Sequence, residues 1–239
     1  MSIFFGQNTN NSVPARVGTW ASGDTGGTTS TTIAPSTGGD DGSGGIDTVV
    51  GNVVVCAVRT ASSTTTATVQ DDASPPNVLT PWTAYQFAGP GSIQLFTGVI
   101  TTAKSGAKFT ATLSGVPSFR GIICGQFSGV AGTRDTGPDG AGGHSAATTT
   151  MLSSSFSTSE PAVIFFAGNV GALSETLSPG TIAGHAVASS GDPLSGFAVT
   201  PTQILALEYY ISPSAQPGVT ASLLLSPTNA ALWAAAAIY

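Results

Sequence analysis

The sequence predicts an all-β protein, an antiparallel β-sandwich of the jelly-roll kind with an extended N-terminal arm. Gly (31) and Pro (15) are abundant, and Ser and Thr fill much of the remainder. These residues disfavour helices and favour strands and turns. Hydrophobic residues reach 41%, in short β-branched runs such as Val53-Val54-Val55. Short strands at this spacing, separated by turn formers, are typical of sandwiches and barrels.

The 239 residues suit one large β domain with an arm. Residues 1–45 form a Gly/Thr/Ser/Asn-rich segment that ends in a flexible GGDDGSGG stretch, and residues 46–239 form the predicted sandwich domain. Ile3, Phe4 and Phe5 are too apolar for a simple tail. We expect these three residues to bind the domain or a partner subunit.

Strands are predicted wherever apolar or alternating runs lie between turn formers. Two short strands are possible within the N-terminal segment, at 15–20 and 28–33. The strands predicted for the domain are residues 47–59, 64–70, 82–87, 92–102, 107–113, 120–128, 147–156, 162–167, 184–188, 197–200, 204–211, 220–225 and 232–239.

Two segments depart from this strand pattern. The polar, Gly-rich residues 129–145 are predicted to form a long loop. The C-terminal NAALWAAAAIY could form a helix capped by Asn229, because alanine has the highest helix propensity. The segment is short and ends on Ile-Tyr, which favours a buried terminal strand.

Charge excludes some partners. The net charge is −6, and the six Lys and Arg residues stand apart, so no basic patch is available for nucleic acid. A surface with few charges suits contact with copies of the chain or with another protein, because little charge must be desolvated. The first residues lack the pattern of a signal peptide, and no run of about 18 apolar residues occurs. We therefore expect neither secretion by a signal peptide nor a membrane span.

Cys56 and Cys124 each lie inside an apolar run, VVVCAV and GIICGQF. This setting favours two buried free thiols, and a disulfide remains possible only if the two strands are close neighbours. Two cysteines at this separation, with two isolated histidines, do not form a zinc site.

No catalytic residue and no cofactor are predicted, so we expect a non-enzymatic protein. A nucleophile would need a base, and no G-x-S-x-G is present. His144 is expected to be a solvated loop residue, and His185 an edge or core histidine of a strand. Glu208 is expected to face outward from its strand. The alternative is a lone carboxylate in a cleft, where it could have a functional role.

Calcium is the remaining chemical candidate. Residues 42–49 are close to one copy of the nonapeptide repeat that binds calcium in β-rolls, but such sites need stacked repeats. Asp40, Asp41 and Asp47 would supply oxygens in this flexible loop. Asp135 and Asp139 form a similar candidate in the next long loop. The prediction for the whole chain is nevertheless that it holds no metal.

The order of the blocks resembles a β-sandwich domain of tailed-phage virion structural proteins. The matching stretches are the strand 49–59, the V-Q-D-D to W-T segment at 69–83, the pair 109–113 and 122–130 ending in QFSGV, and the final strand 233–239. Gln126 stands where that family's E-Y-S-G-V strand end has an acidic residue. The domain is also similar to that of some bacterial surface proteins, so the resemblance implies a virion or surface structural role and carries no active site.

These observations favour a capsid decoration or cement protein that binds the head surface and neighbouring subunits. The expected partners are the major capsid protein or other virion proteins, and a homo-oligomer such as a trimer would fit. The expected location is the capsid surface, after synthesis in the host cytoplasm. The alternative is a carbohydrate-binding or adhesion module of a tail or head fibre, for which Trp82, Tyr85 and Phe87 would have to form an exposed aromatic stripe.

Overall fold

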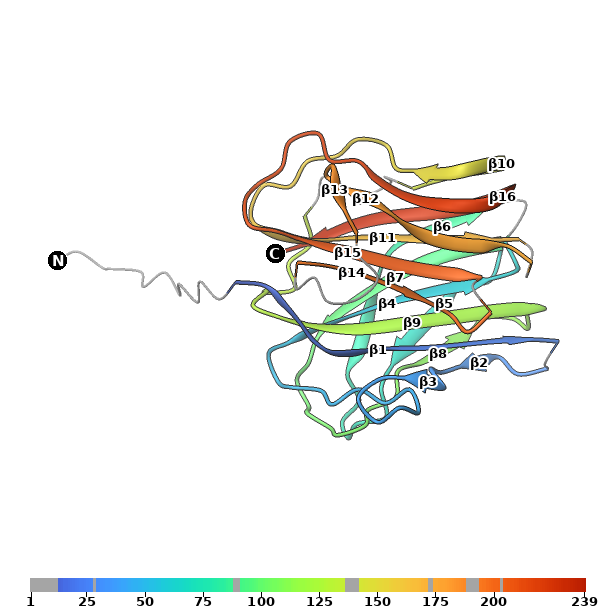
Figure 1. Cartoon of the computed structure of the whole chain (residues 1–239). Coiled ribbons are helices and arrows are strands. Elements are labelled where there is room, and N and C mark those ends of the chain that lie inside the picture. Colours follow the sequence, from blue (N-terminus) through green and yellow to red (C-terminus); the bar gives the residue numbers. More distant parts are fainter. Residues whose placement is uncertain are drawn as a thin grey trace.

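The computed structural model of the chain contains sixteen strands and no helix among the described residues (Figure 1). These residues are 13–27, 29–87, 91–135, 142–171, 174–187, 194–202 and 204–239, with the backbone only for 83–87. Ile3, Phe4 and Phe5, on which the predicted docking of the arm depends, lie outside them. The strands form two antiparallel sheets.

The first sheet has nine strands and forms the lower part of Figure 1. Strands that lie far apart along the chain become neighbours in this sheet, and β1 lies beside β9. In spatial order the strands are β2 (Thr32–Ile33), β8 (Thr110–Leu113), β5 (Ala67–Gln70), β6 (Val78–Phe87), β7 (Gly91–Val99), β4 (Val53–Thr60), β9 (Phe119–Ser128), β1 (Ala15–Gly26) and β3 (Thr37–Gly38).

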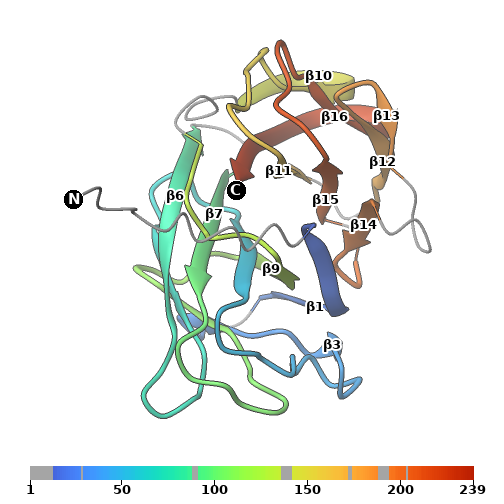
Figure 2. The same ribbon diagram turned by 90° about the vertical axis from the view of Figure 1, so that its left-hand side faces the viewer.

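The second sheet is built around the long C-terminal strand and lies above the first. Its order is β13 (His185–Ala186), β12 (Thr176–Ile182), β16 (Ala221–Ile238), β11 (Ala162–Val170), β15 (Leu205–Ser212) and β14 (Ser195–Val199). β10 (Gly143–Leu152) pairs with β16 outside this path. The sheets are strongly curved, into a half-barrel and a near-barrel (Figure 2).

Three apolar clusters pack against the two sheets. One lies between the sheets, one is enclosed by the second sheet alone, and one is covered by the first sheet and its loops. Alternate residues of β4 serve different clusters: Val53 and Val55 face the second sheet, whereas Val54 and Cys56 face the other side. Burial on both faces explains the continuous apolar runs of β4 and β11.

The all-β antiparallel prediction is confirmed. The jelly-roll sandwich is not confirmed, because a simple sandwich has one core between its sheets and here each sheet also curls around a core of its own.

The C-terminal segment is a strand, as predicted, and it is longer than expected. The predicted strands 220–225 and 232–239 form one 18-residue strand, β16. The strand predicted at 184–188 is reduced to the two residues of β13, and β12 was missed. The start of β10 at Gly143 shortens the predicted loop 129–145.

The two cysteines form a disulfide, so the expectation of free thiols is wrong. Cys56 of β4 stands directly opposite Cys124 of β9, with their Cα atoms 4.2 Å apart. This short spacing matches a non-hydrogen-bonded antiparallel pair, in which side chains approach most closely. Pairing between β4 and β9 could not be read from the sequence, because 68 positions separate the two cysteines.

Candidate functional site

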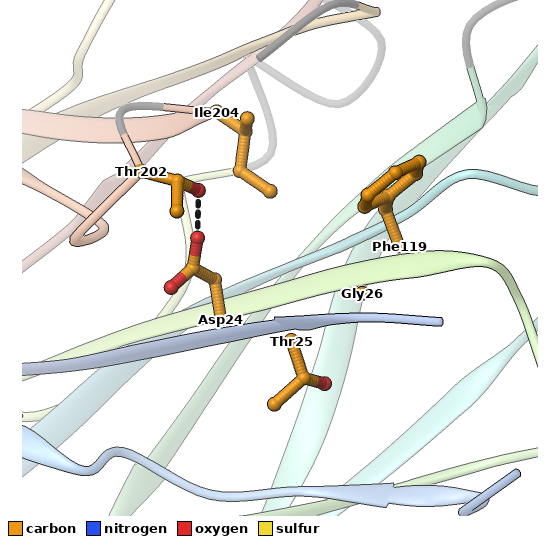
Figure 3. Close-up of a pocket in the computed structure, with 6 residues that line it drawn as sticks. All are labelled: Asp24, Thr25, Gly26, Phe119, Thr202 and Ile204. Atoms are coloured by element: carbon orange, nitrogen blue, oxygen red, sulfur yellow. Dashed lines mark hydrogen bonds between the residues drawn. The ribbon is translucent and has the colours of Figure 1, made fainter. Parts of the chain in front are cut away.

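A pocket of about 310 Å³ lies where the two sheets meet at one end of β1 (Figure 3). The first sheet supplies its floor, and the turn between β14 and β15 covers it from the second sheet. The lining residues are Asp24, Thr25 and Gly26 of β1, Phe119 of β9, and Thr202 and Ile204 of the turn.

The turn above the pocket is held in place by its first residue. The Thr200 hydroxyl accepts the Ile204 amide at 3.2 Å, and the Thr200 amide donates to the Leu205 carbonyl at 2.9 Å. The turn rests on Gly121 of β9, where an added Cβ would lie 3.3 Å from the Thr200 methyl group. A glycine here lets the second sheet approach the first closely.

Gly121 also stands between an acidic and a basic residue on the two neighbouring strands. It pairs with Asp24 of β1 on one side and with Arg59 of β4 on the other. Residues directly opposite on neighbouring strands face the same side of a sheet. Both charged side chains therefore face the second sheet, with no side chain between them.

The Asp24 carboxylate is half-buried and accepts a hydrogen bond from the Thr202 hydroxyl (Figure 3). Burial raises the pKa of Asp24 above its ordinary value, and a hydrogen bond from the Thr202 backbone and the charge of Arg59 oppose this effect only in part. Burial disfavours the charged form of a carboxyl group. Asp24 thus keeps its proton to a higher pH than an exposed carboxyl group does.

Arg59 is only 2% exposed. Its Nη2 donates to the Val170 carbonyl at 3.2 Å, while its Nε and Nη1 have no hydrogen-bond partner among the described residues. Burial lowers the pKa of Arg59 to about 10, and Asp24 opposes the shift. The Val170 amide donates to the Ile204 carbonyl at 3.3 Å, so Val170 links the guanidinium to the backbone of a residue that lines the pocket.

Glu208 of β15 is a second unusual carboxyl group, and the expectation that it faces outward is wrong. It is fully buried, because β11 and β14 flank it and the curved second sheet encloses its face. Its Oε2 accepts the Gly180 amide of β12 at 3.1 Å, while Oε1 has no partner within the described part of the chain. Burial raises the pKa of Glu208 to about 8. A strand that looked half-exposed in sequence is covered on both sides.

Gly180 explains why this contact exists. The pairing of β12 with β16 is irregular between Pro179 and Thr181, which leaves Gly180 out of the ladder. The amide of a bulged residue needs another acceptor. Glu208 supplies it from β15, a strand that is not adjacent to β12 in the sheet.

The calcium candidates Asp40, Asp41 and Asp47 act as acceptors in the loops around them. Hydrogen bonds from Gly45 and Ser43 lower the pKa of Asp41, and those from Ser105 and Gly106 lower that of Asp47. The described residues include no group of three His, Cys, Asp or Glu side chains placed to hold a metal ion. The amide donors are Thr19 and Asp47 to Asp40, Ser43 and Gly45 to Asp41, and Gly106 to Asp47.

Neither histidine lines the pocket. His144 belongs to β10 and not to a loop, and it is exposed. His185 is also exposed and stacks on Tyr210, with ring centroids 4.5 Å apart. Asp135 is buried and accepts the Ser159 amide at 2.7 Å, whereas Asp139 lies outside the described residues.

Trp82 is half-buried against the cluster between the sheets, with the Arg134 guanidinium 5.4 Å above its ring. The side chains of Tyr85 and Phe87, which would complete an aromatic stripe, lie outside the described residues. The pocket at Asp24 was not found from the sequence, because Asp24 reads as an ordinary turn former between Gly23 and Thr25.

No protein-family model matches the chain, and neither curated proteins nor solved structures give a match. Within the described ranges, no helix is long and apolar enough to cross a membrane.

Proposed function

We propose that the chain is a non-enzymatic virion structural protein, a capsid decoration protein that binds the head surface and neighbouring subunits. The observation that supports this proposal best is an uncharged face on the second sheet. Strands β10, β12 and β16 contain no Asp, Glu, Lys or Arg residue. β10 and β16 lie together at the top of the molecule in both ribbon views (Figures 1 and 2).

The outward residues of these strands form what we call the neutral face. Leu224 of β16 is its centre, because it pairs with Thr150 of β10 on one side and with Ser178 of β12 on the other. Leu224 is 46% exposed and Leu152 is 54% exposed. The neutral face consists of Thr150, Leu152, Thr176, Ser178, Leu224 and Ser226.

Such a face suits a broad protein contact. Charged residues are depleted at the cores of protein interfaces, because each one must be desolvated or paired when it is buried. Hydroxyl groups can exchange water for partner groups at little cost, and the two exposed leucines gain from burial. Among the described residues, six charged side chains are buried, and all six lie outside β10, β12 and β16: Arg59, Asp71, Arg120, Asp135, Glu175 and Glu208.

The expected partner is the major capsid protein, and self-association as a trimer fits the same logic of repeated uncharged contacts. The chain would then be located on the capsid surface, after synthesis in the host cytoplasm. We include in this proposal the jelly-roll-like sandwich inferred from the sequence, because many copies of such a domain can cover a capsid shell.

Binding to particles tests the proposal. Particles from the native source are stripped of the chain, and the purified protein is added back and followed by sedimentation. Wild type should rebind, and Leu224→Asp should rebind at least tenfold less tightly, because a carboxylate is placed at the centre of the contact. Val116→Asp is the matched control, since Val116 is 52% exposed and follows β8 in the first sheet.

Circular dichroism and thermal melting establish that both variants are folded. The proposal fails if wild type does not rebind to particles. It also fails if Leu224→Asp and Val116→Asp rebind equally well.

A further inference from the structure

We propose that the pocket formed by Asp24, Phe119, Thr202 and Ile204 binds a single neutral sugar unit of a glycan. This inference does not depend on the role in the virion, because the pocket and the neutral face are built from different strands. It rests on three features: the size of the pocket, the charges around it and its aromatic wall.

The size of the pocket limits the ligand. Its volume of about 310 Å³ lies at the lower end of the range for small-molecule sites. A ligand of this size is one ring with its substituents, and a longer chain would have to leave through the open side. The pocket therefore fits one unit of a larger molecule.

The charges favour a neutral ligand. The Asp24 carboxylate lines the pocket and repels an anion. The charge of Arg59 acts on Asp24 and offsets part of its attraction for a cation. A neutral hydroxyl group avoids this repulsion, and it donates one hydrogen bond and accepts two. It can donate to the Asp24 carboxylate.

Thr202 extends this polar edge. Its hydroxyl hydrogen is directed at the Asp24 carboxylate, which leaves the lone pairs of its oxygen as acceptors. Asp24 and Thr202 thus offer two adjacent acceptors on one side of the pocket (Figure 3). Two neighbouring hydroxyl groups of a sugar ring can donate to such a pair together.

The opposite side of the pocket is apolar. The Phe119 ring lies across from Asp24 and Thr202, and Ile204 lies above them (Figure 3). Gly26 allows this position, because an added Cβ at Gly26 would lie 2.6 Å from Cε1 of Phe119. A sugar ring has polar edges and a face of C–H groups, so it can place hydroxyls at Asp24 and its face on the aromatic ring.

Nuclear magnetic resonance titration of the full chain tests the inference. The probes are methyl glycosides of glucose, galactose, mannose and N-acetylglucosamine, with methyl phosphate and methylammonium as charged comparators. We expect at least one glycoside to give saturable shifts of the Gly26 and Ile204 amides with a millimolar dissociation constant. The charged comparators should leave these amides unshifted.

Three variants locate the binding. Asp24→Asn should weaken glycoside binding at least tenfold, because hydrogen bonds to a charged acceptor are the strong ones. Phe119→Leu should weaken it several-fold while keeping the wall apolar. Glu160→Gln is the control: it removes an exposed carboxylate two residues before β11, at the opposite end of that strand from Val170.

The inference is overturned if none of the four glycosides gives saturable shifts, or if Asp24→Asn and Phe119→Leu bind as wild type does. It is also overturned if a charged comparator binds in place of the sugars. None of these results bears on rebinding to particles, so the two proposals stand or fall separately.

Discussion

Replacing Glu208 by Gln should remove a large dependence of stability on pH. The pKa of Glu208 rises from 4.5 to about 8 in the folded chain, because burial disfavours its charged form. Between these values the unfolded chain has lost the proton and the folded chain still holds it. The free energy of unfolding therefore falls as pH rises, by about 1.4 kcal/mol per pH unit from this one group.

Across the whole interval from pH 4.5 to 8 the loss amounts to about 5 kcal/mol, a large share of the stability of a typical domain. Below pH 4.5 Glu208 does not lower the free energy of unfolding, and above pH 8 it lowers this free energy by the full amount. Gln keeps the size of the side chain and an oxygen that can accept the Gly180 amide. It cannot ionise, so the variant should lack this contribution.

The assay is urea unfolding at pH 5, 7 and 9 for wild type and for Glu208→Gln. Other titrating groups are common to both proteins and cancel in the difference. The variant should match wild type to within about 1 kcal/mol at pH 5 and exceed it by several kcal/mol at pH 9. Glu160→Gln, an exposed change, should show no such trend. A difference between wild type and Glu208→Gln that is constant with pH would refute the reasoning.

Three further predictions concern the interior. Reduction of the Cys56–Cys124 disulfide should lower the free energy of unfolding by about 4 kcal/mol, since it opens a loop of 68 positions; equal unfolding midpoints with and without reductant would contradict this. Gly125→Ala should cost about 1–3 kcal/mol in thermal unfolding, because its Cβ would lie 2.2 Å from the Trp20 ring; an unchanged melting temperature would show that Trp20 moves freely. Arg59→Met should leave stability unchanged or raise it, because two buried nitrogens of Arg59 lack hydrogen-bond partners within the described part of the chain; a loss above about 2 kcal/mol in urea unfolding would show that the guanidinium is well paired.

Local patterns in the sequence predicted the strand content, because β-branched runs and turn formers act within a few residues. The run at β4 and the terminal strand β16 are the clearest cases. β12 was missed because Pro179 and Gly180 read as a turn, although here they form an irregularity inside a strand. The curvature of the sheets could not be predicted from the sequence either, because it arises from pairings between strands that are distant along the chain.

The candidate site depended almost entirely on long-range register. Asp24 and Arg59 meet over Gly121 only because β1 and β4 both pair with β9. Glu208 was expected to be solvated because alternation along one strand cannot reveal a second layer over the same face. The same limitation concealed the disulfide, since Cys56 and Cys124 are neighbours only through the β4–β9 pairing.

Electron cryo-microscopy of intact particles from the native source tests the central proposal most directly. We expect all-β density seated on the capsid shell, with Leu152 and Leu224 of the neutral face against the major capsid protein or a neighbouring copy of the chain. Particles that lack this density, or that carry it with the neutral face turned to solvent, would contradict the account.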